Sequence, residues 1–219
     1  MGILGAYGRL CAAALLGAAP AQAWAHDDDA QLWIGQTLTH RIDEDMLIVG
    51  EMTERFREAK VGGDQYLGRI TLTRRVAPGV EVALGVAAST NSGIGEIRPE
   101  QAIILTRGPF SLRTRLEERM IDGVPETALR LRERLGLALP LDAKARWTLI
   151  ASGELFFQLN RTRPSDVTGL NAVRTQLGFR HALTPALSLT ALYQRQQGIR
   201  PGAQDTVAHI SVLAIGWAF

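Results

Sequence analysis

The chain has 219 residues, 46% of them hydrophobic, and its 24 basic and 22 acidic residues leave a net charge of +2. A balance so close to neutral excludes the strongly basic footprint of a typical nucleic-acid-binding protein. Cys11 is the only cysteine, which excludes an internal disulfide bond.

The first 25 residues have the features of a secretory signal peptide. Arg9 supplies a positive charge, residues 10–19 are apolar, and small residues then fit cleavage after Ala23 or Ala25. The apolar run is shorter than the roughly 20 residues that a membrane-spanning helix needs. We therefore expect residues 1–25 to direct export and residues 26–219 to form a single domain.

From residue 31 onward, apolar and polar side chains alternate with a period of two, which indicates strands with one apolar and one polar face. The alternation is clearest in the last segment, where Ile215, Trp217 and Phe219 share one face. Eleven such segments begin near residues 31, 46, 64, 80, 97, 110, 127, 147, 171, 187 and 206.

These segments predict an all-β fold, an antiparallel up-and-down transmembrane β-barrel of about 10–12 strands. Beyond residue 25 no apolar stretch is long enough for a spanning helix, and a membrane protein without one must close its backbone hydrogen bonds in a barrel. Single-chain bacterial barrels normally have even strand numbers, so we expect the count of eleven to miss a strand, split one or include a segment outside the wall. A soluble periplasmic β-sandwich that binds a ligand is the alternative left open.

The connections between segments alternate between short and long. Short turns are expected at 77–79, 108–109, Pro140 and 184–185, and longer polar loops at 58–64, 90–96, 122–127, 160–170 and 198–205. Outer-membrane barrels place short turns on the periplasmic side and longer loops outside. The pattern favours the barrel over the sandwich and predicts an outer-membrane location in a Gram-negative bacterium.

The sharpest pattern lies between residues 110 and 139. Arginines and glutamates occupy alternate positions of two segments joined by a turn at 122–127, and leucines occupy the positions between them. A helix over 126–139 is the rival interpretation, but it would place Gly136 inside the helix and leave leucines off its apolar stripe. We expect a hairpin that puts Glu117 opposite or diagonal to Arg132. Glu118 and Glu133 then fall on the apolar face, where a bulge or a rim position would accommodate them.

Charged residues share the polar-face parity of their strands throughout the chain, and we expect them to line the lumen. The predicted ladder consists of Arg69, Glu100, Arg113, Arg115, Glu117, Arg119, Arg130, Arg132, Arg134, Glu154, Arg174 and Arg180. Such a ladder is either a structural plug or the lining of a narrow pore that prefers small anionic solutes. Barrels of about eight strands are filled by side chains and open porins need about sixteen, so both interpretations stay open.

Several short motifs together resemble a bacterial family known as domain of unknown function 2490. They include Gln31-Leu32-Trp33, residues 98–101 (RPEQ), the arginine-rich runs at 113–117 and 130–134, Glu154 with the following Phe156-Phe157, and a terminal aromatic residue. The resemblance covers about residues 30–219 and implies an outer-membrane-type barrel without an established activity. The sequence departs from the family at 217–219 (WAF), where a terminal Tyr-x-Phe is more usual.

Trp217 and Phe219 also resemble the C-terminal signal that barrel-insertion machinery reads, which makes that machinery and outer-membrane lipid the expected partners. A lipid-modifying barrel enzyme is a further alternative, and His209 with Ser211 is the pair that places a histidine and a serine on one strand face. No nucleophile motif accompanies the pair, and the four histidines are too scattered to predict a metal site. We therefore expect a non-catalytic protein without a cofactor.

Overall fold

The alternating segments predicted beyond residue 31 all form β-strands. The computed structural model describes residues 27–163 and 166–219, so the signal peptide predicted for residues 1–25 lies outside the described residues. The elements in chain order are β1 (Asp27–Arg41), β2 (Met46–Phe56), η1 (Ala59–Val61), β3 (Gln65–Ala77), β4 (Val80–Asn91), β5 (Ile94–Arg107), β6 (Phe110–Ile121), β7 (Ala128–Pro140), β8 (Trp147–Gln158), β9 (Gly169–Ala182), β10 (Leu187–Gly198) and β11 (Thr206–Ala218). Among these residues no helix is both long and apolar enough to span a membrane.

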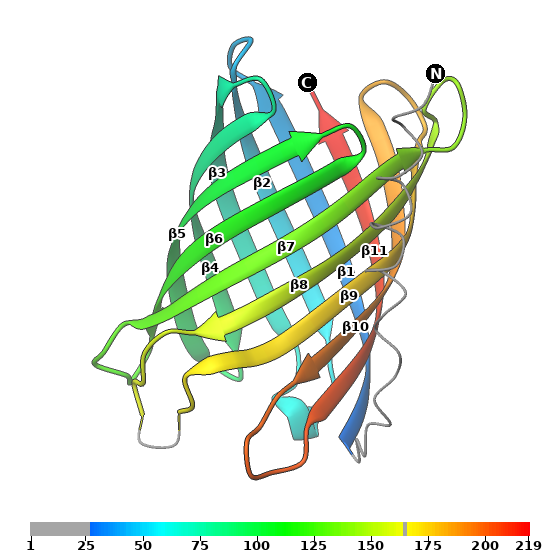
Figure 1. Ribbon diagram of the computed structural model, residues 1–219. Helices are drawn as coiled ribbons and strands as arrows, with labels where there is room; N and C mark the ends of the chain where they lie inside the picture. The colour runs from blue at the N-terminus through cyan, green and yellow to red at the C-terminus, as the bar shows by residue number, and fades with distance from the viewer. Residues whose placement is uncertain (1–26, 164–165) are drawn as a thin grey trace, which may run out of the picture.

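The eleven strands form one closed barrel (Figure 1). Each strand pairs antiparallel with its neighbour in the chain, and β1 closes the barrel by parallel pairing with β11. An up-and-down barrel with an odd number of strands must close in this way, because its first and last strands run in the same direction. The expectation of an even strand number is therefore wrong: all eleven predicted segments lie in the wall, and the fold is antiparallel everywhere except at this seam.

The rival helix over 126–139 does not form. Strand β7 occupies this region and pairs with β6 without interruption from Phe110 opposite Leu137 to Arg119 opposite Ala128. The arginines on alternate positions of β7 all point to the inner face, where Arg130 and Arg132 meet acidic side chains and Arg134 meets Gln176. A helix would place Arg132 on the face opposite to the other two.

The connections gather at the two ends of the barrel according to strand direction (Figure 1). One end carries the turns at 42–45, 78–79, 108–109, 141–146 and 183–186, and the other carries the connections at 57–64, 92–93, 122–127, 159–168 and 199–205. Two lengths differ from the prediction. The connection expected at 90–96 has only residues 92 and 93 outside the strands, because β4 and β5 extend into it.

The second difference is the connection after Pro140, which has six residues, 141–146, and not the expected tight turn. The carboxylate of Asp142 organises it by accepting backbone N–H groups from Trp147 at 2.7 Å, Arg146 at 3.2 Å and Lys144 at 3.0 Å. These hydrogen bonds, the one from Trp147 first, hold the pKa of Asp142 below its usual 3.8.

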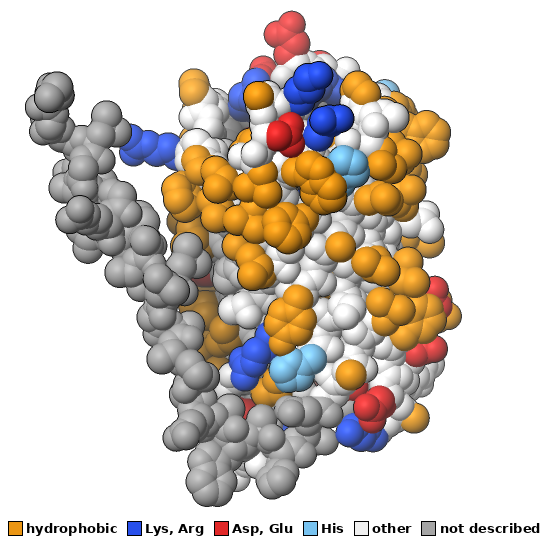
Figure 2. Space-filling view, turned by 90° about the vertical axis from the view of Figure 1, so that its right-hand side faces the viewer, with side chains coloured by type: hydrophobic (Ala, Val, Ile, Leu, Met, Phe, Trp, Pro, Cys, Tyr) orange, Lys and Arg blue, Asp and Glu red, His pale blue; other side chains and the backbone are white. Residues whose placement is uncertain are grey.

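The outer face of the wall is apolar and solvent-accessible. Large hydrophobic side chains on it are exposed, from 36% at Phe56 to 67% at Met52. Figure 2 shows that such side chains form bands on the surface, with charged side chains beyond them at the barrel end. Monomeric soluble proteins seldom expose so much contiguous apolar surface, so the barrel has the outer face of a membrane protein.

The seam between β1 and β11 is fastened at one end by Phe219. Its backbone N–H donates to the carbonyl oxygen of Thr39 at 3.0 Å, and its carbonyl accepts the N–H of Arg41 at 3.3 Å. The Phe219 ring lies 5.0 Å from the ring of His40 and 6.3 Å from that of Trp217. Three neighbouring side chains thus cover the end of the only parallel strand pair among the described residues.

Changing Phe219 to Asp should lower the yield of folded barrel several-fold, because a carboxylate replaces the aromatic contact with His40 and Trp217. The yield is measured as the fraction of membrane-associated protein that migrates as the folded form in an unheated gel. Leu141→Asp is the control, since Leu141 is an exposed residue of a turn at the same end. Equal folded fractions for the two variants would show that Phe219 has no special part in closing the seam.

Candidate functional site: a charged lumen

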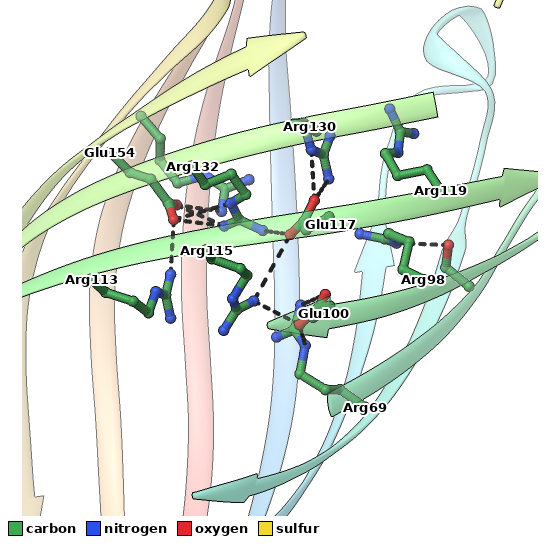
Figure 3. Close-up of polar contacts among 12 residues, drawn as sticks. Arg69, Arg98, Glu100, Arg113, Arg115, Glu117, Arg119, Arg130, Arg132 and Glu154 are labelled. Atoms are coloured by element: carbon green, nitrogen blue, oxygen red, sulfur yellow. Dashed lines mark hydrogen bonds and ion pairs between the residues drawn. The ribbon is translucent and has the colours of Figure 1, made fainter. Parts of the chain in front are cut away.

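Ion-paired charged side chains line the lumen on seven strands, from β2 to β9 with the exception of β4. The ion-paired residues of the inner face, hereafter the lumen network, are Glu51, Arg69, Glu96, Arg98, Glu100, Arg113, Arg115, Glu117, Arg119, Arg130, Arg132, Glu154 and Arg174. The alternation of each strand puts these side chains on one face, and the closure of the barrel then makes that face the inside (Figure 3).

Glu117 on β6 is the most enclosed member of the lumen network, with its side chain 0% exposed. Arg130 lies directly opposite on β7 and donates its Nε–H to Glu117 at 2.6 Å. Arg132, the next inner residue of β7, donates its Nη1–H to the other carboxylate oxygen at 2.5 Å. Arg115 Nη1 stands 3.9 Å from the same oxygen. Glu117 is therefore diagonal to Arg132, as one of the two predicted registers requires.

Glu154 on β8 is the second acidic centre. Arg132 binds it in a two-pronged manner, with Nη2 2.8 Å from both carboxylate oxygens and Nε 3.1 Å from Oε1. Arg113 reaches it from β6 at 2.8 Å, and Arg174 on β9 lies 3.5 Å away. Arg132 thus bridges Glu117 and Glu154, the two acidic centres of the β6–β8 wall.

Glu100 on β5 continues the lumen network towards the first strands. It pairs with Arg115 at 3.0 Å on one side and with Arg69 at 3.0 Å on the other. Arg69 in turn reaches Glu51 on β2 at 3.1 Å. Ion pairs therefore run without a break from β2 to β9: Arg69 and Glu100 pair across β4, and Arg115 joins Glu117 within β6 at 3.9 Å.

A smaller cluster lies nearer the end with the longer loops. Glu96 on β5 accepts the Nε–H of Arg119 at 2.5 Å and lies 3.2 Å from Nε of Arg98. Arg98 also donates to the hydroxyl of Ser89 at 2.9 Å. Two arginines therefore share the one carboxylate of this cluster, as two arginines share Glu100.

Two aromatic rings face into the lumen among the arginines. The guanidinium carbon of Arg132 lies 4.5 Å from the ring centre of Phe156, and that of Arg174 lies 4.9 Å from it. Arg55 lies 3.9 Å from the ring centre of Trp33, which Arg174 also approaches at 5.5 Å. Aromatic faces stabilise cations, so these rings help to hold arginines that outnumber the acids.

The structure brings eleven of the twelve residues predicted for the ladder into contact with lumen partners. Ten of them belong to the lumen network, and Arg134 instead donates to the side chain of Gln176 at 3.0 Å. Arg180 is the exception: it lies on the inner face near the turn at 183–186, is exposed, and makes no ion pair within the described residues. It lies at the rim of the lumen and outside the network.

Sequence reasoning missed several lumen residues. Glu51, Arg55 and Glu96 occupy inner positions of their strands. The alternation of inner and outer positions along β2 and β5, applied to every charged residue, would have predicted them. Trp33 and Phe156 carry no such signal, because their apolar rings suggest the outer face. They point inward because neighbouring arginines occupy their ring faces.

Glu118 and Glu133 do lie on the outer face, without a bulge between β6 and β7. Glu118 is one pair from the end of the β6–β7 ladder, and Glu133 lies in its middle. Each has a polar neighbour on that face: Gln101 donates to Glu118 at 3.2 Å, and the Thr114 hydroxyl donates to Glu133 at 2.8 Å. These contacts partly satisfy two carboxylates in an otherwise apolar surface.

His209 and Ser211 also lie on the outer face of β11, so they do not line the lumen. The ring nitrogen Nδ1 of His209 is 2.6 Å from the hydroxyl of Tyr193, and the pair therefore points away from any enclosed site.

A cavity of about 380 Å³ adjoins the lumen network inside the barrel. Seven arginines and two glutamates contribute to its lining, together with five glutamines and both inward aromatic rings. Arg55 and Arg134 add two cations to the eight arginines and five glutamates of the lumen network, and the buried Asp29 of β1 adds one acid on the same face as Trp33. Among these residues positive charges therefore exceed negative ones by four.

The closed barrel, its apolar outer face and its charged lumen define a porin-like barrel of the outer-membrane type. The chain belongs to the family described as protein of unknown function DUF2490, whose model matches residues 30–207. This confirms the family resemblance of the sequence.

The NanC porin has a similar fold. Its structure matches 82% of this chain and 93% of its own with a TM-score of 0.54 and 9% sequence identity. A structure from work on in-meso crystallization of membrane proteins matches 78% of this chain and 71% of its own, with a TM-score of 0.44 and 15% identity. The comparison with curated proteins found no match.

Proposed function

We propose that the protein is a non-catalytic barrel of the Gram-negative outer membrane whose lumen is a narrow passage that prefers small anions. The observation that carries the proposal is the cavity of about 380 Å³, to whose lining seven arginines and only two glutamates contribute. Fixed positive charge in a confined space of low dielectric attracts anions and repels cations.

The outer surface supports the membrane location. Trp147, Trp217 and Phe219 project from the wall near the end with the shorter turns, and Phe56 and Tyr66 project near the other end. Aromatic side chains gather at both water–lipid boundaries of transmembrane barrels, with an apolar band between them. Outer-membrane lipid is thus the proposed surrounding of the wall, and the export signal and the insertion machinery are its proposed route there.

The lumen network supplies the constriction. Its glutamates hold the arginines in fixed positions, because each of Glu96, Glu100, Glu117 and Glu154 pairs with at least two of them. An anion that enters the cavity meets guanidinium groups that are already oriented, so little reorganisation opposes its binding. Because arginines outnumber glutamates, positive charge remains uncompensated after the internal ion pairs have formed, and this charge attracts an anion.

A structural plug is the second candidate, and the full burial of Glu117 favours it. A carboxylate whose two oxygens are both taken by arginines closes the lumen at that point. The plug predicts a barrel that is stabilised by the lumen network and carries no ionic current.

Recordings from the purified barrel in planar lipid bilayers separate the two candidates. The passage predicts discrete current steps in potassium chloride, smaller than those of wide porins because the lumen network narrows the path. The plug predicts a flat trace after insertion has been verified by protease protection of the same sample. A flat trace from verified insertions would therefore overturn the proposed passage.

A further inference from the structure

Arg55 is a cation of the cavity that has no acidic partner among the described residues. Its Nη1–H donates to the side-chain oxygen of Gln65 at 2.8 Å, and its guanidinium lies over Trp33. Its Nε–H has no hydrogen-bond partner, and no carboxylate whose position is described lies within ion-pair distance. An enclosed guanidinium normally pairs with a carboxylate or another oxyanion, so Arg55 is incompletely satisfied.

Arg174 approaches the same Trp33 ring from β9, at 5.5 Å from the ring centre. Its acidic partner, Glu154, lies 3.5 Å away and is already bound by two other arginines at 2.8 Å. Its side-chain hydrogen bonds go to the neutral side chain of Gln196, at 3.0 Å and 2.5 Å. The guanidinium groups of Arg55 and Arg174 thus lie beside one ring with little negative charge nearby to compensate them.

Gln194 on β10 presents an unpartnered donor to the same cavity. The residue is 1% exposed, and its Oε1 accepts a hydrogen bond from Gln176 at 2.7 Å. Its Nε2 group has no partner among the described residues. A buried amide donor without an acceptor costs free energy, and a bound acceptor would recover it.

Arg55, Arg174 and Gln194 all line the cavity of about 380 Å³, together with Trp33. We propose that these residues form a binding site for a small oxyanion, a carboxylate or phosphate group, inside the barrel. The anion oxygens accept hydrogen bonds from Arg55 Nε and Gln194 Nε2 and neutralise the two guanidinium groups beside Trp33. This inference rests on the proposed anion-preferring passage, because the site would be the place where an anion binds as it crosses the barrel.

Isothermal titration calorimetry on the detergent-solubilised barrel tests the site with two probes, butyrate and inorganic phosphate, at constant ionic strength set with chloride. Saturable binding of at least one probe is expected, and the probe that binds identifies the oxyanion class. Arg55→Gln should weaken that binding at least tenfold, and Gln194→Leu, which changes no charge, should weaken it several-fold.

Arg195→Gln is the matched control, because Arg195 lies on the outer face of the same strand as Gln194 and donates a hydrogen bond to Gln197 there. It should leave the affinity unchanged. Arg55→Lys, which keeps the charge but loses the Nε donor, should bind more weakly than wild type and more tightly than Arg55→Gln. Folding of each variant is verified by heat-modifiable gel migration.

The site is overturned if neither probe binds saturably, or if binding is the same in wild type, Arg55→Gln and Gln194→Leu. Anion-selective current without saturable binding would leave the passage standing and remove the site. Saturable binding that depends on Arg55 in a barrel that carries no current would keep the site and remove the passage.

Discussion

Glu117→Ala is expected to destabilise the barrel by about 3–5 kcal/mol, because removing one partner of a buried ion pair leaves the other charges uncompensated. The side chain of Glu117 is fully buried, and both of its oxygens are bound by arginines of β7, Arg130 and Arg132. Without it, these two guanidinium groups and Arg115 face one another around an empty position. Urea unfolding in lipid vesicles, followed by tryptophan fluorescence, gives the loss directly.

A second change at Arg130 should restore part of that stability. Among the described acids Arg130 pairs only with Glu117, so Glu117→Ala with Arg130→Ala removes both members of one pair. Glu126→Ala, in an exposed loop position, is the control and should change stability by less than about 0.5 kcal/mol. Strictly additive losses in the double-mutant cycle would show that Glu117 and Arg130 do not interact.

Gly178→Ala is expected to cost about 3 kcal/mol or more, since overpacking a tight contact forces backbone shifts. A Cβ atom at Gly178 would lie 2.1 Å from the carbonyl oxygen of Ala191 and 2.7 Å from Cα of Leu192. Both atoms belong to the backbone of β10, which cannot move without breaking its pairing with β9. The same urea titration and the folded fraction in unheated gels measure the effect.

Gly153→Ala is the matched control on the neighbouring strand β8. No atom lies within 4 Å of its hypothetical Cβ, so the added methyl group meets open space on the outer face. Stability should stay the same or rise by about 0.5 kcal/mol, because alanine restricts the unfolded chain more than glycine does. Equal destabilisation by the two substitutions would mean that replacing any strand glycine lowers stability, and that the close approach of β9 to β10 is not the reason.

Most of the fold could be predicted because period-two alternation is a local property of the sequence. The β6–β7 hairpin is the clearest case: arginines and leucines on alternate positions fix both the strands and the face that points inward. The closure could not be predicted in the same way, because the pairing of β1 with β11 depends on the strand number and not on any local pattern.

The charged residues of the lumen could be predicted from the sequence, and its aromatic residues could not. Glu117 and Glu154 follow from parity alone, since a carboxylate facing lipid is costly. Phe156 and Trp33 looked like outer-face residues, and only their contacts with Arg132 and Arg55 explain why they point inward. The lengths of the connections at 92–93 and 141–146 also escaped prediction, because turn residues mark where a strand can end and not where its pairing stops.

The zero-current potential of the barrel under a potassium chloride gradient tests the central claim most directly, because it reports the sign of the charge that permeating ions encounter. The excess of arginines over acids among the lumen residues predicts a potential that favours chloride over potassium. Arg55→Glu should move that potential towards cation preference, and Arg195→Glu on the outer face should not. A wild-type potential that favours potassium, or one that Arg55→Glu leaves unchanged, would contradict an anion-preferring lumen.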